Sequence, residues 1–192
     1  MTMYCVNTQQ VVEQTLSKSR FIGVLVPCAN EREVLSALKG LHGEHLGATH
    51  IAYAYRLKTE SGLVYRFHDA GEPTGTAGKP IFQHVEGKDL VNVLLAVIRY
   101  FGGIKLGAGG LTRAYGNTAK LAIAAADCQP YVERVTVSLQ LDYAKMQALA
   151  YLLKKLDGHI VQQDFAAQIR LSVQLPTAQL ADLCAAFPEV RV

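Results

Sequence analysis

A glycine-rich, basic segment is the part of this sequence whose residue types point most directly to chemistry. The segment RYFGGIKLGAGGLTRAYGNTAK spans residues 99–120 and contains six glycines and no acidic residue. Glycine-rich backbone that leads into a helix exposes N–H groups near the positive end of the helix dipole, which favours anions. We therefore predict a phosphate-binding site. Its cations are Arg99, Lys105, Arg113 and Lys120, and its loop backbone is that of Gly102, Gly103, Gly107, Gly109 and Gly110.

Nearby side chains extend this prediction. Tyr100 and Tyr115 would offer flat faces on which bases stack, and Lys79 would face the segment from a second loop. This mixture of cations and aromatic rings suits RNA, or the phosphate and ring of a nucleotide. The alternative interpretation is structural, because glycines at a strand-to-helix corner also permit close packing and the tyrosines would then lie in the core.

Known phosphate-binding fingerprints do not match the segment. In GxxxxGK[ST], the second glycine would be Gly107, but Ala108 follows it instead of lysine. In GxGxxG, Gly107 and Gly109 fit the first two positions, but Thr112 occupies the third. Neither pattern supports an ATP-binding site.

A second loop, HDAGEPTGTAGKP (68–80), contains a possible acidic site formed by Asp69 and Glu72. Two carboxylates beside a histidine suit general acid–base work or Mg²⁺. Aspartate and threonine side chains in such loops more often bond to their own backbone. We therefore predict no catalytic residue, no metal and no cofactor.

Composition places the chain among ordinary globular proteins. Half of the 192 residues are hydrophobic, 18% are charged, and the net charge is +3. The four cysteines lie far apart without a CxxC pair, which favours free thiols in a reducing compartment. The first residues lack the features of a signal peptide, and the longest apolar run, residues 90–98, is too short to span a bilayer. We expect a cytoplasmic protein without a membrane segment.

Hydrophobic periodicity predicts an α+β domain in residues 1–130. Two strands are expected within 9–28, a helix over 30–42, a strand pair at 48–57 and 62–67, a buried strand over 90–101 and a helix over 111–127. For the first helix, Asn30 is the predicted N-cap. Its apolar face is expected to consist of Val34, Leu35, Leu38 and Leu41.

We predict a second domain over residues 131–192. Its boundary is placed at Pro130, because a proline ends the preceding helix. The expected order is a strand (135–143), a helix (144–156), two strands (159–165 and 167–175), a helix (177–187) and a strand (189–192). This βαββαβ order is ferredoxin-like. The charge excess lies in the first domain, because residues 1–131 carry a net charge of +3 and residues 132–192 a net charge of 0.

Four motifs resemble those of the IMPACT family, and in particular of its bacterial members. They are residues 99–116, DAGEPTGTAGKPI (69–81), KSRFIG (18–23) and ATHIAYAYR (48–56). Many relatives have a second acid where this chain has Ala70. The resemblance implies an N-terminal domain like domain two of ribosomal protein S five, and a ferredoxin-like C-terminal domain similar to domain five of elongation factor G. Eukaryotic relatives regulate translation with an additional N-terminal domain, so we do not expect their mechanism here.

These observations lead to one functional hypothesis and two alternatives. The hypothesis is a non-enzymatic protein that binds RNA, the ribosome or ribosome-associated factors and modulates translation. The first alternative is a protein–protein interaction module for a translation factor. The second is an enzyme that binds a phosphorylated small molecule or nucleotide.

Overall fold

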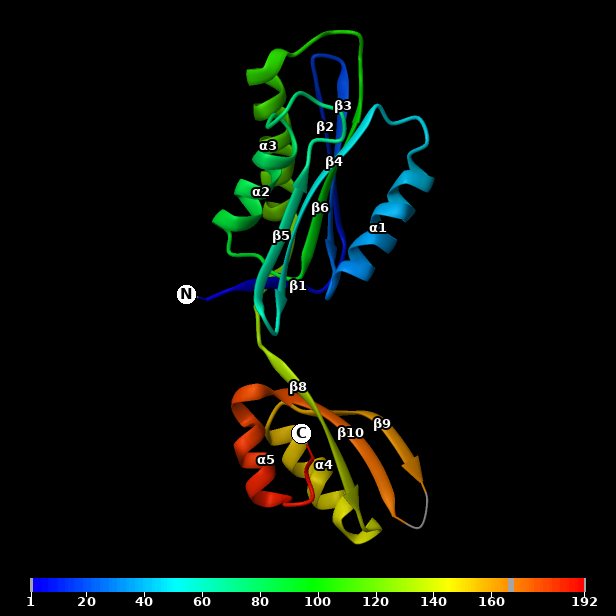
Figure 1. The fold of residues 1–192 in the computed structure, drawn as a ribbon, viewed down its shortest axis with the longest axis vertical. Coiled ribbons are helices and arrows are strands. Elements are labelled where there is room, and N and C mark those ends of the chain that lie inside the picture. The colour runs from blue at the N-terminus through cyan, green and yellow to red at the C-terminus, as the bar shows by residue number, and fades with distance from the viewer. Residues whose placement is uncertain (1, 166–167, 192) are drawn as a thin grey trace. The chain divides into compact units, whose positions relative to one another are not determined.

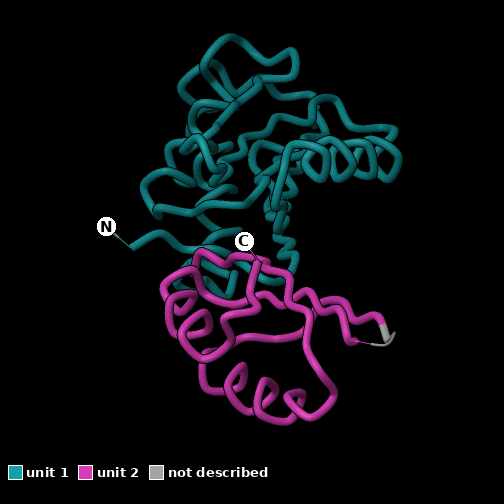
Figure 2. The backbone as a smooth tube through the Cα atoms, turned by 60° about the horizontal axis from the view of Figure 1, so that its bottom comes forward, with its two compact units in different colours: residues 1–131 teal, residues 132–192 magenta. Residues whose placement is uncertain are grey.

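The computed structural model describes residues 2–165 and 168–191, which form two compact units, residues 1–131 and residues 132–192 (Figure 2). Both units combine helices and strands, which confirms the α+β class. No helix formed by the described residues is long and apolar enough to cross a membrane. The elements are β1 (Tyr4–Val6), β2 (Gln10–Leu16), β3 (Ser19–Pro27), α1 (Glu31–Glu44), β4 (His50–Thr59), β5 (Gly62–His68), α2 (Gly78–Gly87), β6 (Val93–Tyr100), α3 (Gly107–Ala125), β7 (Cys128–Pro130), β8 (Arg134–Leu141), η1 (Tyr143–Lys145), α4 (Met146–Lys155), β9 (His159–Phe165), β10 (Ile169–Pro176), η2 (Thr177–Gln179) and α5 (Leu180–Ala186).

Unit 1 is built on a five-stranded antiparallel sheet of order β2-β3-β6-β4-β5. Helices α2 and α3 cover one face, and α1 covers the other (Figure 1). Strand β6 is central and buried from Val93 to Arg99. A strand covered on both faces has apolar residues at nearly every position, and the predicted buried strand is confirmed for this reason.

Helix α1 begins with the predicted cap. The Oδ1 of Asn30 accepts a hydrogen bond from the Glu33 N–H at 3.0 Å, and the Glu33 carboxylate accepts one from the Ala29 N–H at 2.7 Å. This reciprocal arrangement satisfies two N–H groups at the helix start. The predicted apolar face is wrong at Leu35, which is 67% exposed because it lies one position past the buried Val34 and points into solvent.

Helix α2 was not predicted from the sequence, and helix α3 starts earlier than predicted. Helix α2 begins at Gly78, within the segment predicted to be a loop, and Pro80 lies in its first turn, where a missing N–H costs nothing. Helix α3 begins at Gly107, so Gly107, Gly109 and Gly110 belong to a helix rather than to the predicted loop.

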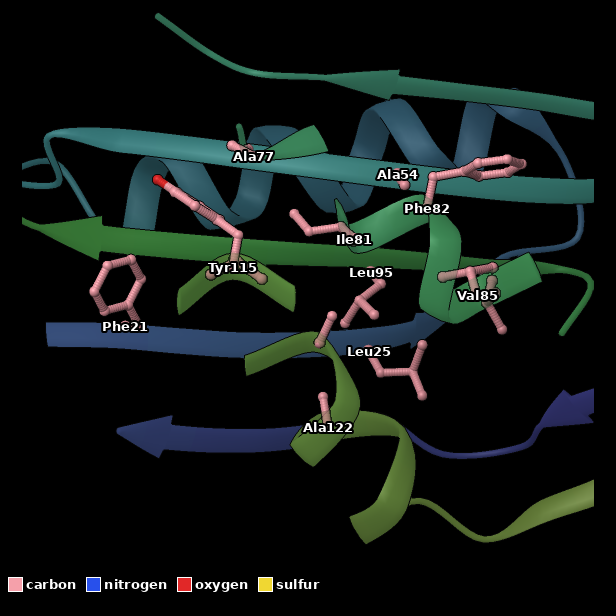
Figure 3. Packing of buried hydrophobic residues seen from close by; sticks show 14 of the residues in the cluster. Phe21, Leu25, Ala54, Ala77, Ile81, Phe82, Val85, Leu95, Tyr115 and Ala122 are labelled. Atoms are coloured by element: carbon pink, nitrogen blue, oxygen red, sulfur yellow. The ribbon is translucent and has the colours of Figure 1, made fainter. Parts of the chain in front are cut away.

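The main core of unit 1 lies between the sheet and these two helices. Figure 3 shows Ile81 and Val85 of α2 and Tyr115 of α3 pointing onto the sheet, where Phe21 and Leu95 meet them. All five side chains are fully buried. Each burial of a large apolar side chain stabilises the fold by roughly 1.5–3 kcal/mol.

Unit 2 contains an antiparallel sheet of order β8-β10-β9 and the helices α4 and α5. Its βαββα order confirms the first five predicted elements. In place of the expected last strand, the described residues show a single antiparallel bridge between Arg191 and Ser138. Residues 167 and 192, the ends of two predicted strands, lie outside the described residues.

One glycine of the basic segment is required by packing. A Cβ atom at Gly102 would lie 1.9 Å from the Lys18 carbonyl oxygen in the β2–β3 turn. The Gly102 N–H donates a hydrogen bond to the Ser19 Oγ at 3.2 Å. Gly103 has a φ angle of +87°, which residues other than glycine rarely adopt. These contacts favour the structural interpretation for this part of the segment.

The substitution Gly102→Ala is expected to lower the free energy of unfolding by about 1–3 kcal/mol, because the added methyl group forces the backbone of the β2–β3 turn to move. Chemical denaturation followed by circular dichroism measures this loss. The control is Gly40→Ala in α1, where a Cβ meets nothing within 4 Å. It should leave stability unchanged or raise it by about 0.5–1 kcal/mol. Equal effects of the two substitutions would contradict the packing argument.

Candidate nucleic-acid interface

Arg99, the first cation of the predicted site, lies in a cross-strand row at one end of the sheet. It pairs in register with Phe21 of β3 on one side and with His50 of β4 on the other. It is 5% exposed, and its Nη1 donates a hydrogen bond to the Glu72 Oε1 at 2.7 Å. The ring centroids of Phe21 and Phe101 lie 5.6 and 5.4 Å from its Cζ atom. The prediction that Arg99 contacts phosphate is therefore wrong, because its charge is buried and paired inside the protein.

Glu72 is the centre of a polar cluster, which we call the Glu72 cluster and which consists of the buried residues Glu72, Arg99 and Tyr115 and the half-buried His50. The Glu72 Oε1 also accepts a hydrogen bond from the Tyr115 hydroxyl at 2.8 Å and lies 3.9 Å from the His50 Nε2. The His50 Nδ1 donates to the Ala70 carbonyl at 2.8 Å. Burial, together with the hydrogen bond to Glu72, raises the pKa of Tyr115 above its ordinary value. Tyr115 is fully buried, so the prediction that it stacks on bases is wrong.

Asp69, the other carboxylate of the predicted acidic site, caps helix α2. Its oxygens accept hydrogen bonds from the N–H groups of Gly75, Ala77 and Gly78 at 2.8, 3.0 and 2.8 Å. Burial alone would raise the pKa of this carboxyl, but these hydrogen bonds outweigh it and hold the pKa below its ordinary value. Asp69 and Glu72 are thus both engaged by the protein itself. Among the described residues, no group of three or more His, Cys, Asp or Glu side chains is placed to hold a metal ion.

Tyr100 lies on the wrong face of the sheet for the predicted site. It follows Arg99 in β6, and successive side chains of a strand point to opposite faces. Its ring packs on the α1 side, where its hydroxyl lies 2.8 Å from the His45 Nδ1 and the Arg20 Cζ lies 5.5 Å from the ring centroid. Tyr100 therefore does not lie beside Arg113, which α3 carries on the opposite face.

The remaining predicted cations are exposed. We call them the basic face: Lys79 on α2, Lys105 just before α3, and Arg113 and Lys120 on α3. Arg113 and Lys120 are seven residues apart, which is two helical turns, so they share one side of α3. Within residues 2–165 and 168–191, none of the four forms an ion pair. By contrast, Arg20, Arg56 and Arg99 of the same unit are all paired with carboxylates.

Sequence analysis missed two basic residues at the edge of this face. Exposed Lys88 and half-buried His84 line an open depression between α2 and α3, together with Lys120. Burial and the Lys120 charge lower the pKa of His84. His84 and Lys88 are four residues apart, a spacing that brings side chains together on a helix, but the helix itself was not predicted.

A cavity of about 390 Å³ lies next to the Glu72 cluster and the start of α3. Its walls include the apolar side chains of Pro73, Phe101, Leu106 and Leu111. Lys105 is the exposed cation of its lining, whereas Arg99 is already paired with Glu72. This lining does not resemble a cradle of converging polar groups around a phosphate.

The substitution Glu72→Ala is expected to lower the free energy of unfolding by about 3–5 kcal/mol, because it leaves the Arg99 charge buried without a partner. The control is Glu86→Ala at an exposed position of α2, which should change stability by less than about 0.5 kcal/mol. Urea denaturation of both variants tests the difference. A loss below about 1 kcal/mol for Glu72→Ala would show that the cluster is not a structural requirement.

The Asp69 carboxylate makes stability depend on pH. Its pKa is lower in the folded protein than in the unfolded chain, so its contribution is present above the unfolded pKa of about 3.9 and is lost as the pH falls through the folded pKa. The substitution Asp69→Asn should destabilise the protein at pH 7 and remove this part of the acid dependence. Thermal unfolding between pH 7 and pH 3 measures both effects. Glu60→Gln, in the exposed β4–β5 turn, serves as the control, and an equally steep acid dependence of Asp69→Asn and the wild type would contradict the assignment.

Comparison with known proteins places both units in one family. Residues 17–123 match the Impact N-terminal domain, and residues 139–190 match a domain of unknown function, DUF1949. An IMPACT family member of Haemophilus influenzae is 36% identical over 173 residues, covering 89% of this chain and 84% of that protein. IMPACT family member YigZ of Escherichia coli is 34% identical over 176 residues, covering 91% and 86%.

One solved structure agrees with the sequence relatives. A crystal structure described as a hypothetical protein superposes with a TM-score of 0.72 at 31% identity, covering 96% of this chain and 90% of that chain. The two-domain translational regulator Yih1 gives a TM-score of 0.37 at 19% identity, covering 64% of this chain and 47% of that chain, a likeness too weak to carry a functional argument. The family model that matches more than half of the chain and the two bacterial relatives lead to one conclusion: the chain belongs to the IMPACT family.

Proposed function

We propose that unit 1 binds RNA through the phosphate backbone, with the basic face as the contact surface. The observation that carries this proposal is that Lys79, Lys105, Arg113 and Lys120 are all exposed and form no ion pair among the described residues. An unpaired exposed cation gives up no internal partner when a phosphate binds. Helix α3 also contains no acidic residue, so nothing on it opposes a polyanion.

The chemistry of the basic face suits phosphates better than base edges. Lysines act as point charges, and the Arg113 guanidinium matches the geometry of phosphate oxygens. Contacts to phosphates position a protein on a nucleic acid without reading its sequence. We therefore propose binding that depends strongly on salt and weakly on base sequence. The proposed setting is translation, which rests on the resemblance to the IMPACT family rather than on the basic face.

No observation favours the small-molecule enzyme to the same degree. Asp69 and Glu72 are engaged by backbone N–H groups, by Arg99 and by Tyr115. The cavity beside them is walled largely by apolar side chains. A protein partner of the basic face is a competing outcome of the experiment below.

Fluorescence anisotropy with a labelled oligonucleotide of RNA tests the proposal. If the four cations each engage one phosphate of a single strand, log K should fall with log salt with a slope of about −2.8, which is −0.7 for each phosphate. The double substitution Arg113→Glu/Lys120→Glu should weaken binding and reduce the slope to about −1.4.

The matched control is Arg32→Glu/Lys39→Glu, which makes the same change in net charge on exposed positions of α1, on the other face of the sheet. If both double variants weaken binding equally, overall charge rather than the basic face attracts RNA. Absence of binding at low salt would overturn the proposal and direct attention to a protein partner.

A further inference from the structure

The edge strand β5 carries a stripe of exposed apolar side chains. Leu63, Tyr65 and Phe67 are 44%, 56% and 39% exposed. They alternate along the strand, so they point to the same face of the sheet. Phe67 pairs in register with Ala54, which packs in the core under α2 and α3, so the stripe lies on the α2 side.

The two aromatic rings of this stripe rest on helix α2. The ring of Tyr65 is stacked on Phe82, with centroids 4.7 Å apart and an angle of 22° between the planes. The ring of Phe67 lies 5.6 Å from the same Phe82 ring. Phe82 holds one side of each ring, while the exposed fractions of Tyr65 and Phe67 place much of each ring in solvent. The rings are thus held in place with π-surface free for another flat group.

The stripe adjoins the basic face. Gly78, the first residue of α2, is so close to the end of β5 that a Cβ atom there would lie 2.6 Å from the His68 backbone nitrogen. Lys79 follows Gly78 and is exposed. Phe82, on which the rings rest, is three residues from Lys79 and therefore one helical turn away. Helix α2 thus carries an unpaired cation one turn from Phe82, the ring on which Tyr65 and Phe67 rest.

From this arrangement we propose that Tyr65 and Phe67 form a stacking platform for unpaired bases, so that the nucleic acid of the proposed function is single-stranded RNA. This inference rests on the proposed function. Aromatic rings beside cations that follow the backbone are the means by which proteins hold single strands without reading their sequence. Bases within a duplex are stacked on each other and do not present a free ring face to Tyr65. The basic face alone does not distinguish single-stranded from double-stranded RNA, whereas the stacking platform requires a single strand.

Anisotropy titrations of wild type and variants with the same RNA, single-stranded and annealed to its complement, test the inference. The wild type should bind the single strand more tightly. Tyr65→Ala and Phe67→Ala should each weaken binding to the single strand by about 5-fold to 140-fold, the range expected for the loss of one stacked base. Because neither substitution removes a charge, the salt slope should not change. Tyr65→Phe should bind as tightly as the wild type, and Tyr65→Leu should not, because leucine keeps apolar area but lacks a ring.

The matched control is Tyr151→Ala in α4 of unit 2. Tyr151 is 68% exposed, and the Lys155 Nζ lies 5.9 Å from its ring centroid, so it also combines an exposed ring with a lysine. This substitution should leave RNA affinity unchanged. Thermal unfolding of every variant identifies any loss of affinity that comes from a loss of folded protein.

The outcomes separate this inference from the proposed function. If RNA does not bind at all, both are wrong. If RNA binds with the expected salt slope, but Tyr65→Ala and Phe67→Ala bind as the wild type does, only the stacking platform is wrong. Equal affinity of Tyr65→Leu and the wild type would also overturn it, since an apolar contact would then suffice. Self-association of the wild type without RNA, lost in Tyr65→Ala, would show that a second copy covers the stripe instead.

Discussion

The buried ion pair between Arg99 and Glu72 is the interaction on which the arrangement of this end of unit 1 depends. Arg99 belongs to the central strand, and Glu72 belongs to the segment that leads from β5 to α2. Tyr115 of α3 donates to the same carboxylate oxygen. One buried carboxylate therefore connects the sheet, the segment before α2 and helix α3. Removing a partner from such a pair leaves an uncompensated buried charge, so each member requires the others.

This cluster determines which side chains remain for a partner molecule. Arg99 and Tyr115 have the residue types of a nucleic-acid site, but both are used inside the protein. The same segment supplies Asp69, which caps α2. The cap fixes where this helix begins, and so the positions of Lys79 and Phe82 on it. The structural requirements of one end of the fold thus leave the outer sides of α2 and α3, rather than the glycine-rich backbone, as the proposed RNA surface.

Local patterns in the sequence predicted most of the elements but not the polar contacts between residues far apart in the chain. The strand at β6 followed from its unbroken apolar run, and the start of α1 followed from Asn30, because both depend on neighbouring residues. The partner of Arg99 lies 27 residues away in the chain, and no periodicity indicates such a pairing. Strand alternation alone could have predicted that Tyr100 lies on the opposite face of the sheet from α3. Helix α2 was missed because glycine and proline at its start resemble a loop, while the Asp69 cap comes from nine residues earlier.

Helix α2, which was not predicted from the sequence, joins the two parts of the proposed binding surface, the basic face and the aromatic platform. Its first turn carries Lys79 toward solvent, and the next turn places Phe82 under the rings of Tyr65 and Phe67. A cation and an aromatic platform on separate elements would each be ordinary surface features. Their juxtaposition requires the α2 start to lie against the end of β5, and Gly78 permits this because any side chain there would collide with the His68 backbone. Gly78 and Gly102 therefore act through packing, and Gly78 would contribute to the proposed function by setting where α2 meets β5.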